Sequence, residues 1–159
     1  CGKTSLDSIE ILKKEKLDLS FPLIKEDIIM KSPNLLKNKQ SEFAKTGGIH
    51  ASALIDENGK VIATREDVGR HNALDKLIGY TVHNKIINPQ KQFIACSGRL
   101  NFELVQKGLM ANMGLMVGVG APTSLAIDLA KRYNMTLLGF VKEDSFNIYS
   151  NINRVIIKS

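Results

Sequence analysis

The fold is decided by residues 92–141, which read QFIACSGRLNFELVQKGLMANMGLMVGVGAPTSLAIDLAKRYNMTLLGFV. Short apolar runs alternate in this stretch with longer runs whose apolar residues recur every three to four positions. The first kind is typical of buried strands, and the second is typical of amphipathic helices. The elements predicted here are a strand at 92–96, a helix at 101–113, a strand at 115–119, a helix at 123–133 and a strand at 136–141. This order predicts a layered α/β sheet with crossover helices.

The residues on either side extend the same architecture. The segment 48–64 is predicted to be a β-hairpin, because Asn58-Gly59 supplies residues that adopt the left-handed turn conformation. The further elements predicted are a helix from Asp67 to about Thr81 and short strands at 146–149 and 154–157.

The segment 17–46 is predicted to form two short helices. They are broken at Pro22 and at Ser32-Pro33-Asn34, because proline cannot donate the helical hydrogen bond and crowds the preceding turn. The residues expected on the buried face are Leu35, Leu36, Phe43 and Ala44. We interpret this segment as a contribution to the hydrophobic core rather than as part of a site.

The composition is that of a globular domain. Of the 159 residues, 43% are hydrophobic and 24% are charged, so we expect one domain spanning residues 1–159. The chain begins with Cys1 rather than methionine, and we expect it to be the C-terminal domain of a longer protein. The longest apolar stretch, 114–121, is far shorter than the roughly 20 residues of a membrane helix, so no membrane span is predicted.

Two further features of the composition bear on location and partners. The only two cysteines, Cys1 and Cys96, cannot build a disulfide framework, which favours a reducing compartment and hence the cytoplasm. The net charge of +6 favours anionic partners, but no block of five or more like charges occurs and aromatic residues make up only 6%. Nucleic acid is therefore not the predicted partner, because binding to single strands usually requires interleaved aromatic residues.

Small and polar residues gather at the predicted turns, where ligands bind in open α/β sheets. The candidate ligand-contacting residues are Thr46, Gly47, Gly48 and His50, then Asp67, Gly69, Arg70, His71 and Asn72, then Ser97, Gly98 and Arg99, and finally Ala121, Pro122 and Thr123. None of these turns matches a P-loop or a GxGxxG fingerprint. Four such turns at one sheet edge together predict an extended ligand that carries phosphates.

The first strand-to-helix junction carries cations where a helix disfavours them. Asp67 is predicted to cap the helix, which places Arg70 and His71 in its first turn. Positive side chains at the positive end of a helix make sense if an anion joins them there. In the alternative interpretation, Arg70 pairs with Asp67 or Glu66, and His71 only packs.

The other junctions offer backbone amides and one more arginine. Gly98 allows close approach of the backbone, and Arg99 can hold a phosphate with two hydrogen bonds. Pro122 suits the first position of the next helix, and Thr123 places a hydroxyl beside the free amides. The glycines of this last turn can equally serve tight packing.

Several chemistries are excluded by missing residues. A zinc deaminase needs an H-x-E pair and a C-x-x-C pair, but both His50-Ala51-Ser52 and His71-Asn72-Ala73 lack the glutamate and Cys96-Ser97-Gly98-Arg99 lacks the second cysteine. No metal site is predicted, and no G-x-S-x-G motif supports a serine hydrolase. Cys1 is either a reactive thiolate favoured by Lys3 or an accident of where the chain begins, whereas Cys96 is predicted to be a buried filler.

Four motifs together resemble one known family. They are Thr46-Gly47-Gly48-Ile49-His50, then Glu66-Asp67-Val68-Gly69-Arg70-His71-Asn72-Ala73-Leu74-Asp75-Lys76, then Ser97-Gly98-Arg99 with Val105-Gln106-Lys107, and then Ala121-Pro122-Thr123-Ser124-Leu125-Ala126. They resemble the FdhD family of formate dehydrogenase accessory proteins, in the family's order. The resemblance implies a three-layer, cytidine-deaminase-like mixed sheet with helices on both faces and a lost zinc site.

The resemblance also implies a function. Such proteins take persulfide sulfur from a cysteine desulfurase and pass it to the bis-molybdopterin guanine dinucleotide cofactor of formate dehydrogenase. GDP is then a stand-in for the guanine end of that cofactor, and two guanines would suit a homodimer. The alternatives are a cofactor-binding chaperone that moves no sulfur and, with less support, a nucleotide hydrolase, for which no general base is evident.

Two further sets of residues enter through the resemblance alone. Cys1-Gly2-Lys3 resembles the second half of the family's C-G-x-C-G loop, which makes Cys1 a persulfide carrier, a supporting thiol behind an upstream cysteine, or, in a shifted register, the first cysteine with Thr4 in place of the second. A cofactor-contacting stretch is implied at Phe140, Val141, Lys142, Glu143, Asp144 and Ser145. Because the two carboxylates repel phosphates, contacts there are expected from backbone amides or Lys142; the alternative is a polar turn.

Overall fold

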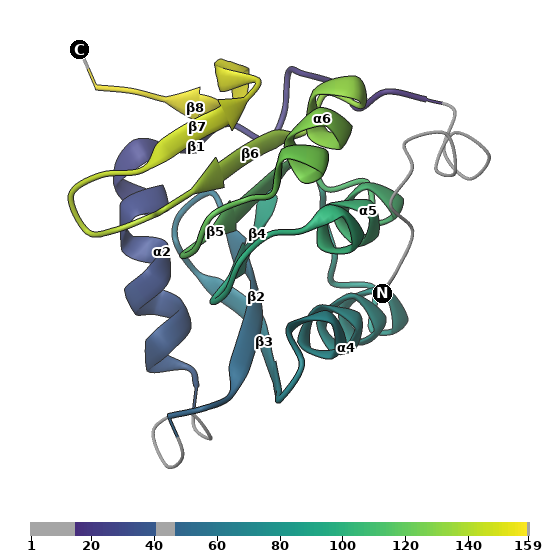
Figure 1. Cartoon of the computed structure of the whole chain (residues 1–159), viewed down its shortest axis with the longest axis vertical. Helices are drawn as coiled ribbons and strands as arrows, with labels where there is room; N and C mark the ends of the chain where they lie inside the picture. The colour runs from purple at the N-terminus through teal and green to yellow at the C-terminus, as the bar shows by residue number, and fades with distance from the viewer. Residues whose placement is uncertain (1–14, 41–46, 159) are drawn as a thin grey trace.

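A six-stranded mixed sheet organises the chain (Figure 1). The computed structural model describes residues 15–40 and 47–158. The helices are α2 (Glu26–Asn38), α4 (Arg70–His83), α5 (Phe102–Met110), α6 (Ser124–Arg132) and the 3₁₀ turn η1 (Ile152–Arg154). The strands are β1 (Ile24–Lys25), β2 (His50–Asp56), β3 (Val61–Asp67), β4 (Gln92–Cys96), β5 (Leu115–Gly118), β6 (Thr136–Gly139), β7 (Asn147–Ser150) and β8 (Val155–Ile156). The predicted alternation of strands and helices is confirmed.

The strands run in the order β3-β2-β4-β5-β6-β7. The three central strands, β4, β5 and β6, are parallel, with Met116 opposite both Ile94 and Leu137. The predicted hairpin β2–β3 is antiparallel and extends one side, and β7 runs antiparallel to β6 on the other. The short strand β8 pairs with β1 in a separate two-stranded sheet, a pairing that was not predicted.

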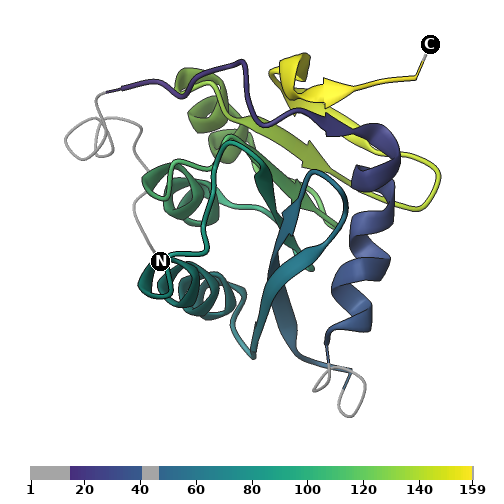
Figure 2. The ribbon, with the colours of Figure 1, turned by 180° about the vertical axis from the view of Figure 1, so that it is seen from behind.

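Helices cover both faces of the sheet, as predicted. Figures 1 and 2 show α4, α5 and α6 on one face and α2 on the other. Successive strand residues point to opposite faces, so Ile94 and Met116 join the core under α4, α5 and α6, whereas Phe93 and Leu115 join the core under α2. Burial on both faces explains why these strands read as continuous apolar runs rather than as alternating patterns.

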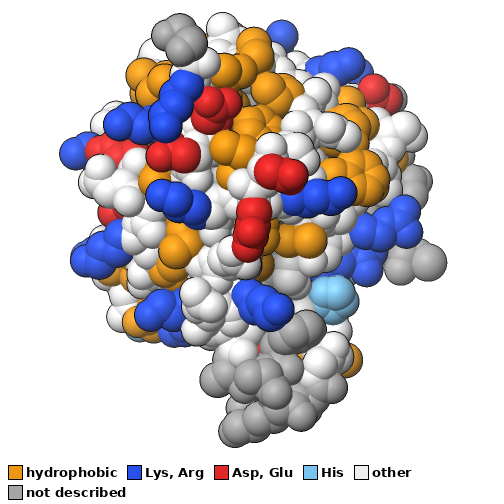
Figure 3. Space-filling model, turned by 90° about the vertical axis from the view of Figure 1, so that its left-hand side faces the viewer, with side chains coloured by type: hydrophobic (Ala, Val, Ile, Leu, Met, Phe, Trp, Pro, Cys, Tyr) orange, Lys and Arg blue, Asp and Glu red, His pale blue; other side chains and the backbone are white. Residues whose placement is uncertain are grey.

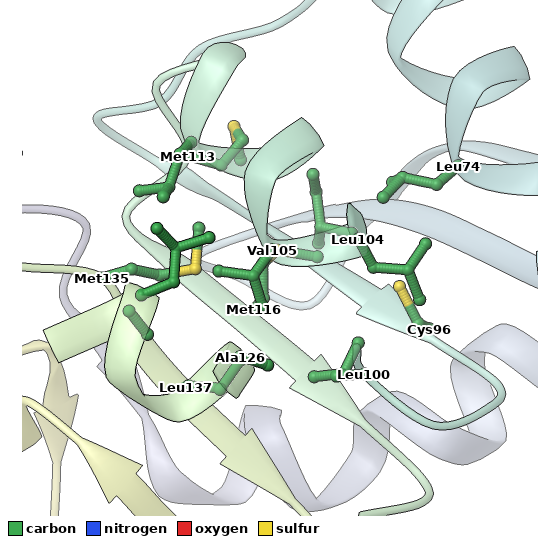
Figure 4. Close-up of a cluster of buried hydrophobic side chains, with 14 of the residues drawn as sticks. Leu74, Cys96, Leu100, Leu104, Val105, Met113, Met116, Ala126, Met135 and Leu137 are labelled. Carbon is green, nitrogen blue, oxygen red and sulfur yellow. The ribbon is translucent and has the colours of Figure 1, made fainter. Parts of the chain in front are cut away.

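The larger core is closely packed around methionine side chains. Figure 4 shows Met113, Met116 and Met135 converging beside Val105. A Cβ atom on Gly108 would lie 2.4 Å from the sulfur of Met116, so α5 reaches the sheet closely at this residue. This close approach holds α5 against β5 and fixes where the helix begins relative to the strand ends.

The segment before the hairpin departs from the prediction. The chain breaks at Pro22, as expected, but it then forms one helix, α2, that runs through Pro33. Because Pro33 has no N–H to donate to the carbonyl of Ile29, that carbonyl needs another donor. The hydroxyl of Ser32 donates to it at 2.7 Å, in a buried position. Of the residues predicted on the buried face, Leu36 is buried and Leu35 is half-buried, and Phe43 and Ala44 lie outside the described residues.

Ser32→Ala is expected to lower the free energy of unfolding by about 2 kcal/mol, because it leaves a buried carbonyl without a donor. The matched control is Thr81→Val in α4, where the Thr81 hydroxyl donates to the carbonyl of Ile78 at 3.1 Å. That carbonyl keeps its helical amide, so the control is expected to cost only about 0.5 kcal/mol. Urea denaturation of both variants checks this; equal losses would contradict the role assigned to Ser32.

The C-terminal strands are shorter than predicted. β6 ends at Gly139 because Phe140 has a left-handed backbone with φ of 50°, which ends the extended conformation. The predicted strand at 154–157 is reduced to Val155–Ile156, because Arg154 belongs to the 3₁₀ turn.

Arg154 is fully buried and connects distant parts of the chain. Its Nε donates to the carbonyl of Phe21 at 2.6 Å, and its terminal nitrogens donate to the carbonyls of Asp18 and Asn134. Nη1 also donates to the hydroxyl of Thr136 at 3.2 Å. Burial lowers the pKa of Arg154 to about 10, so the guanidinium stays charged at neutral pH. These bonds fasten the segment before β1 to the sheet.

In the described ranges, the helices are too short or too polar to cross a lipid bilayer.

Candidate functional site

The predicted turns meet at one edge of the sheet. β4, β5 and β6 are parallel and end there, and the antiparallel hairpin brings the start of β2 and the end of β3 to the same edge. The register places His50 opposite Asp67, and Cys96 opposite both Ser52 and Gly118. The parallel arrangement therefore assembles turns that are far apart in sequence.

Asp67 does not cap the helix that follows it. α4 begins at Arg70 with Gly69 as the N-terminal cap residue, and Asp67 is the last residue of β3. One carboxylate oxygen accepts from the amide of Gly69 at 2.9 Å, and the other pairs with Lys76 at 2.7 Å. The hydrogen bond from Lys76, with that from Gly69, lowers the pKa of Asp67 below its ordinary value. The prediction of a cap was wrong because the turn takes two more residues before the helix begins.

Arg70 and His71 lie in the first turn of α4, as predicted. The partner of Asp67 is Lys76, and no salt bridge joins Asp67 to Arg70 within the described residues. The Nε atom of Arg70 is buried and has no hydrogen-bond partner among those residues. A buried donor without a partner costs about 1–3 kcal/mol, so a small movement of the half-buried Arg70 side chain that brought Nε to a ligand acceptor would be stabilising.

The side chains of Arg70 and His50 meet over Gly98. A Cβ atom on Gly98 would lie 3.1 Å from Nδ1 of His50 and 3.6 Å from Cδ of Arg70. The hydroxyl of Ser97 accepts from the amide of Ala51 at 2.9 Å and lies 3.4 Å from Nδ1 of His50. Three of the predicted turns are thereby brought together, and a side chain at residue 98 would require the imidazole of His50 to shift slightly.

The third junction is interlocked with the second. The amide of Gly120 donates to the carbonyl of Gly98 at 3.3 Å, and that of Leu100 donates to the carbonyl of Ala121 at 3.2 Å. A Cβ atom on Gly120 would lie 3.0 Å from Cγ of Arg99, whose side chain is exposed. Arg99 is thus held beside the end of β5 with its guanidinium at the surface.

Pro122 is not in the helix, contrary to the prediction. α6 begins at Ser124, and Thr123 is its N-terminal cap, with a hydroxyl that accepts from the amide of Ala126 at 3.2 Å. Threonine is a stabilising residue at a helix cap. Pro122 lies before the helix and forms an isolated parallel β-bridge with Leu100. The hydroxyl predicted to lie beside free amides therefore already binds one of them.

Half of the stretch 140–145 has amides that are bonded within the chain. The amides of Phe140 and Val141 donate at 3.2 Å to the carbonyls of Gly120 and Gly118, and the amide of Lys142 donates at 2.8 Å to the carbonyl of Ser145. These three amides are therefore not available to a ligand, and the contact expected from the side chain of Lys142 stays a prediction. The ring of Phe140 is 44% exposed, Lys142 is exposed, and Glu143 accepts from Asn34 of α2.

A cleft of about 460 Å³ opens between this edge and α2. Its predicted members are Gly47, Gly48, His50 and Ser97. Its wall also contains residues that the sequence interpretation missed, namely Pro33, Asn34, Leu36, Lys37, Gln40, Ile49 and Val119. The signal that could have found part of this wall is the spacing of Asn34 and Lys37, which places them on one face of α2, with Gln40 following just after the helix ends.

Charge on this side of the molecule is mixed. Figure 3 looks onto the face that carries α2 and shows Lys and Arg side chains spread among hydrophobic ones, with a few acidic side chains between them. No group of three His, Cys, Asp or Glu side chains that could hold a metal occurs among the residues of 15–40 and 47–158. The implied loss of a zinc site stays a prediction.

Cys96 is a buried thiol at the end of β4. Cys96 is 3% exposed and lies 3.4 Å from the hydroxyl of Ser52, and burial raises the pKa of its thiol to about 11. The prediction that Cys96 is a buried filler is confirmed, because a neutral, enclosed thiol is a poor nucleophile. Cys1 and Thr46 lie outside the described residues.

Comparison with known proteins finds one family that matches nearly the whole chain. The model of the FdhD/NarQ family matches residues 1–156. Sulfur carrier protein FdhD of Streptomyces coelicolor is 39% identical over 100% of this chain and 57% of its own length, and the protein of that name from Sulfurisphaera tokodaii is 42% identical over 98% of this chain and 59% of its own. This chain therefore spans less than two thirds of the length of these relatives.

A solved structure shares the fold. A formate dehydrogenase accessory protein from Desulfotalea psychrophila superimposes with a TM-score of 0.81 and 24% identity, covering 90% of this chain and 61% of that one. The family match over nearly the whole chain and the identity to the two sulfur carrier proteins agree with the four motifs that the sequence carries. The chain belongs to the FdhD/NarQ family.

Proposed function

We propose that this chain is the cofactor-binding part of a sulfur carrier that serves formate dehydrogenase. Its client is the bis-molybdopterin guanine dinucleotide cofactor, and one guanine nucleotide end of that cofactor binds at the sheet edge. The observation that carries this proposal is the buried Nε of Arg70, which has no partner among the described residues and lies where the turns of His50 and Gly98 meet. The names of the relatives support the sulfur-carrier part of this proposal.

The size and chemistry of the edge suit a nucleotide. A cleft of about 460 Å³ lies within the range of about 300–1,000 Å³ that small-molecule sites have, so it can hold one nucleotide rather than the whole cofactor. Arg70 and Arg99 lie outside the lining of the cleft, and we assign to them the pyrophosphate beyond it, because guanidinium groups hold phosphates with paired hydrogen bonds. Phe140 presents an exposed ring from a strained backbone, which suits stacking on a flat heterocycle.

The proposed chemistry at Cys1 is the acceptance of one sulfur atom. The Cys1 thiolate attacks the outer sulfur of a persulfide on a cysteine desulfurase, forming a new S–S bond on Cys1. The S–S bond of the donor breaks, and the desulfurase cysteine leaves as a thiolate. Sulfur is exchanged between two thiols, so this step needs no external oxidant or reductant.

A second candidate is a chaperone that binds the cofactor and moves no sulfur. It is favoured by the state of Cys96, which is buried and whose thiol has a pKa of about 11, so this cysteine is a poor nucleophile. Under either function we propose a cytoplasmic location, a cysteine desulfurase and formate dehydrogenase as partners, and a homodimer. The relation to cytidine deaminases with a lost zinc site belongs to the same proposal.

Sulfur labelling separates the two candidates. The protein is incubated with a cysteine desulfurase and ³⁵S-cysteine, and label on the protein is measured without reductant. Cys1→Ala is expected to lose at least about 90% of the label, because the pKa of Cys96, about 11, leaves that thiol neutral. The matched control, Cys96→Ala, is expected to keep the label. If Cys1→Ala is labelled like the wild-type protein, the carrier function is wrong and the chaperone remains.

A further inference from the structure

The imidazole of His71 contacts two side chains at the start of α5. Its Nε2 lies 2.9 Å from Nδ2 of Asn101 and 3.4 Å from Oε2 of Glu103. Each contact demands a different state of the ring. Asn101 Nδ2 can only donate, so it needs an unprotonated Nε2, whereas Glu103 can only accept and favours a protonated Nε2.

The orientation of the Asn101 amide is fixed by the helix that it caps. Its Oδ1 accepts from the amide of Leu104 at 3.1 Å, which is the capping bond of α5. Turning the amide over would give His71 an acceptor, but it would place an NH₂ group against the amide of Leu104 and lose the cap. A lost cap costs about 1 kcal/mol, so the amide keeps its nitrogen toward His71.

The contact with Asn101 outweighs the contact with Glu103. A distance of 2.9 Å is that of a full hydrogen bond, whereas 3.4 Å is longer than the 2.7–2.9 Å of a charge-assisted one. The side chains of His71 and Glu103 are 33% and 28% exposed, so water weakens their attraction. Asp75 lies one turn further along α4, but it pairs with Lys107 at 2.9 Å. Within the described residues, Glu103 is therefore the carboxylate that contacts the imidazole of His71.

We propose that Asn101 is a positioning residue that holds neutral His71 in the tautomer with the proton on Nδ1. Nε2 then accepts from Asn101, and Nδ1–H, on the main-chain side of the ring, is the single donor that the imidazole offers in the first turn of α4. The use of this donor in ligand recognition rests on the proposed function. The tautomer itself does not, because it follows from contacts within the chain.

Two-bond ¹H–¹⁵N correlation spectra of the intact chain test the tautomer directly. They are recorded at about pH 8.5, where an ordinary imidazole is neutral. The chain has 3 histidines, so His71→Gln identifies the signals of His71. His71 is expected to show a protonated Nδ1 and an unprotonated Nε2, whereas the exposed His83 shows the proton on Nε2 that an unconstrained imidazole prefers.

Two variants of Asn101 keep the helix cap and change the contact. Aspartate and serine both cap helices well, so α5 is retained in Asn101→Asp and Asn101→Ser, and an unchanged far-UV circular dichroism spectrum reports an intact fold. Each variant removes the donor that faces His71, and the proton is expected to move to Nε2. A wild-type His71 with the proton on Nε2, or a proton that stays on Nδ1 in both variants, would overturn the proposal.

A binding measurement then separates the tautomer from the function. If Nδ1–H serves a ligand, Asn101→Ser is expected to bind GDP about tenfold more weakly than the wild-type protein. An unchanged affinity together with a moved proton would overturn the role in recognition. A wild-type protein that binds no GDP would count against the proposed function while the spectra still decide the tautomer.

Discussion

Replacing Arg154 with methionine is expected to lower the free energy of unfolding by about 3–5 kcal/mol. The substitution removes the donors that serve the carbonyls of Phe21, Asp18 and Asn134, and it leaves these part-buried acceptors without their partner in the chain. Methionine fills most of the space, so the loss is due to unsatisfied acceptors rather than to a cavity. It also leaves the segment before β1 with the bonds of Leu17 to Tyr133 and Asn134 as its remaining links to the loop before β6 among those described.

Thermal and urea denaturation measure this loss. Lys131→Met is the matched control, because it removes one positive charge from an exposed position at the end of α6. It is expected to change the unfolding free energy by less than about 0.5 kcal/mol. Gly114→Ala is also expected to lower the free energy of unfolding, because its Cβ atom would lie 2.5 Å from Nε of Arg154 and displace the guanidinium from its acceptors. A loss below about 1 kcal/mol in Arg154→Met would mean that the buried guanidinium bonds add little to stability.

Replacing Arg70 with alanine is expected to weaken GDP binding about 10-fold to 100-fold. The reason is that hydrogen bonds to a charged group contribute about 1.5–3 kcal/mol, and the Nε atom of Arg70 has no partner of its own among the described residues. Calorimetry with the wild-type protein and the variant gives the ratio of affinities.

Arg65→Ala is the control for that measurement. It removes the same charge from β3, but Arg65 lies 3.8 Å above the ring of Tyr80 and donates to the carbonyl of Thr64. If net charge alone attracts the nucleotide, both variants lose affinity equally, and the site at Arg70 is contradicted. If the edge binds the nucleotide, only Arg70→Ala loses affinity strongly, and Arg65→Ala changes by less than about threefold.

The sequence predicted the sheet well where local patterns decide structure. The apolar runs that became β4, β5 and β6 and the Asn58-Gly59 turn depend on neighbours in sequence, so their periods and turn residues are sufficient. Pro33 was wrongly taken as a helix break, because the hydroxyl of Ser32 supplies the bond that proline cannot. That compensation depends on the direction of a side chain, which no period in the sequence reveals.

The site was predicted only in part for a similar reason. Parallel strands bring their ends to one edge, so His50, Arg70 and Gly98 could be placed together from strand order alone. The part of the cleft wall that α2 supplies could not be predicted, because no local sequence pattern shows which face of the sheet a helix covers. The amides of Phe140 and Val141 donate to the carbonyls of Gly120, in the turn after β5, and of Gly118, the last residue of β5. These bonds join segments that are far apart in the sequence, so no local pattern predicts them.

The glycine amides provide the most direct test that the turns at this edge form one ligand site. Gly47, Gly48, Gly69, Gly98, Gly118, Gly120 and Gly139 lie at this edge, whereas Gly59, Gly79, Gly108 and Gly114 lie in the hairpin turn, within helices or before β5. GDP is titrated into the ¹⁵N-labelled chain, and the glycine region of the ¹H–¹⁵N spectrum is followed. The expected result is saturable shifts of the edge glycines, led by Gly98, with the second group unmoved. Shifts centred on Gly59 or Gly114, or none at the edge at millimolar GDP, would contradict a nucleotide site there.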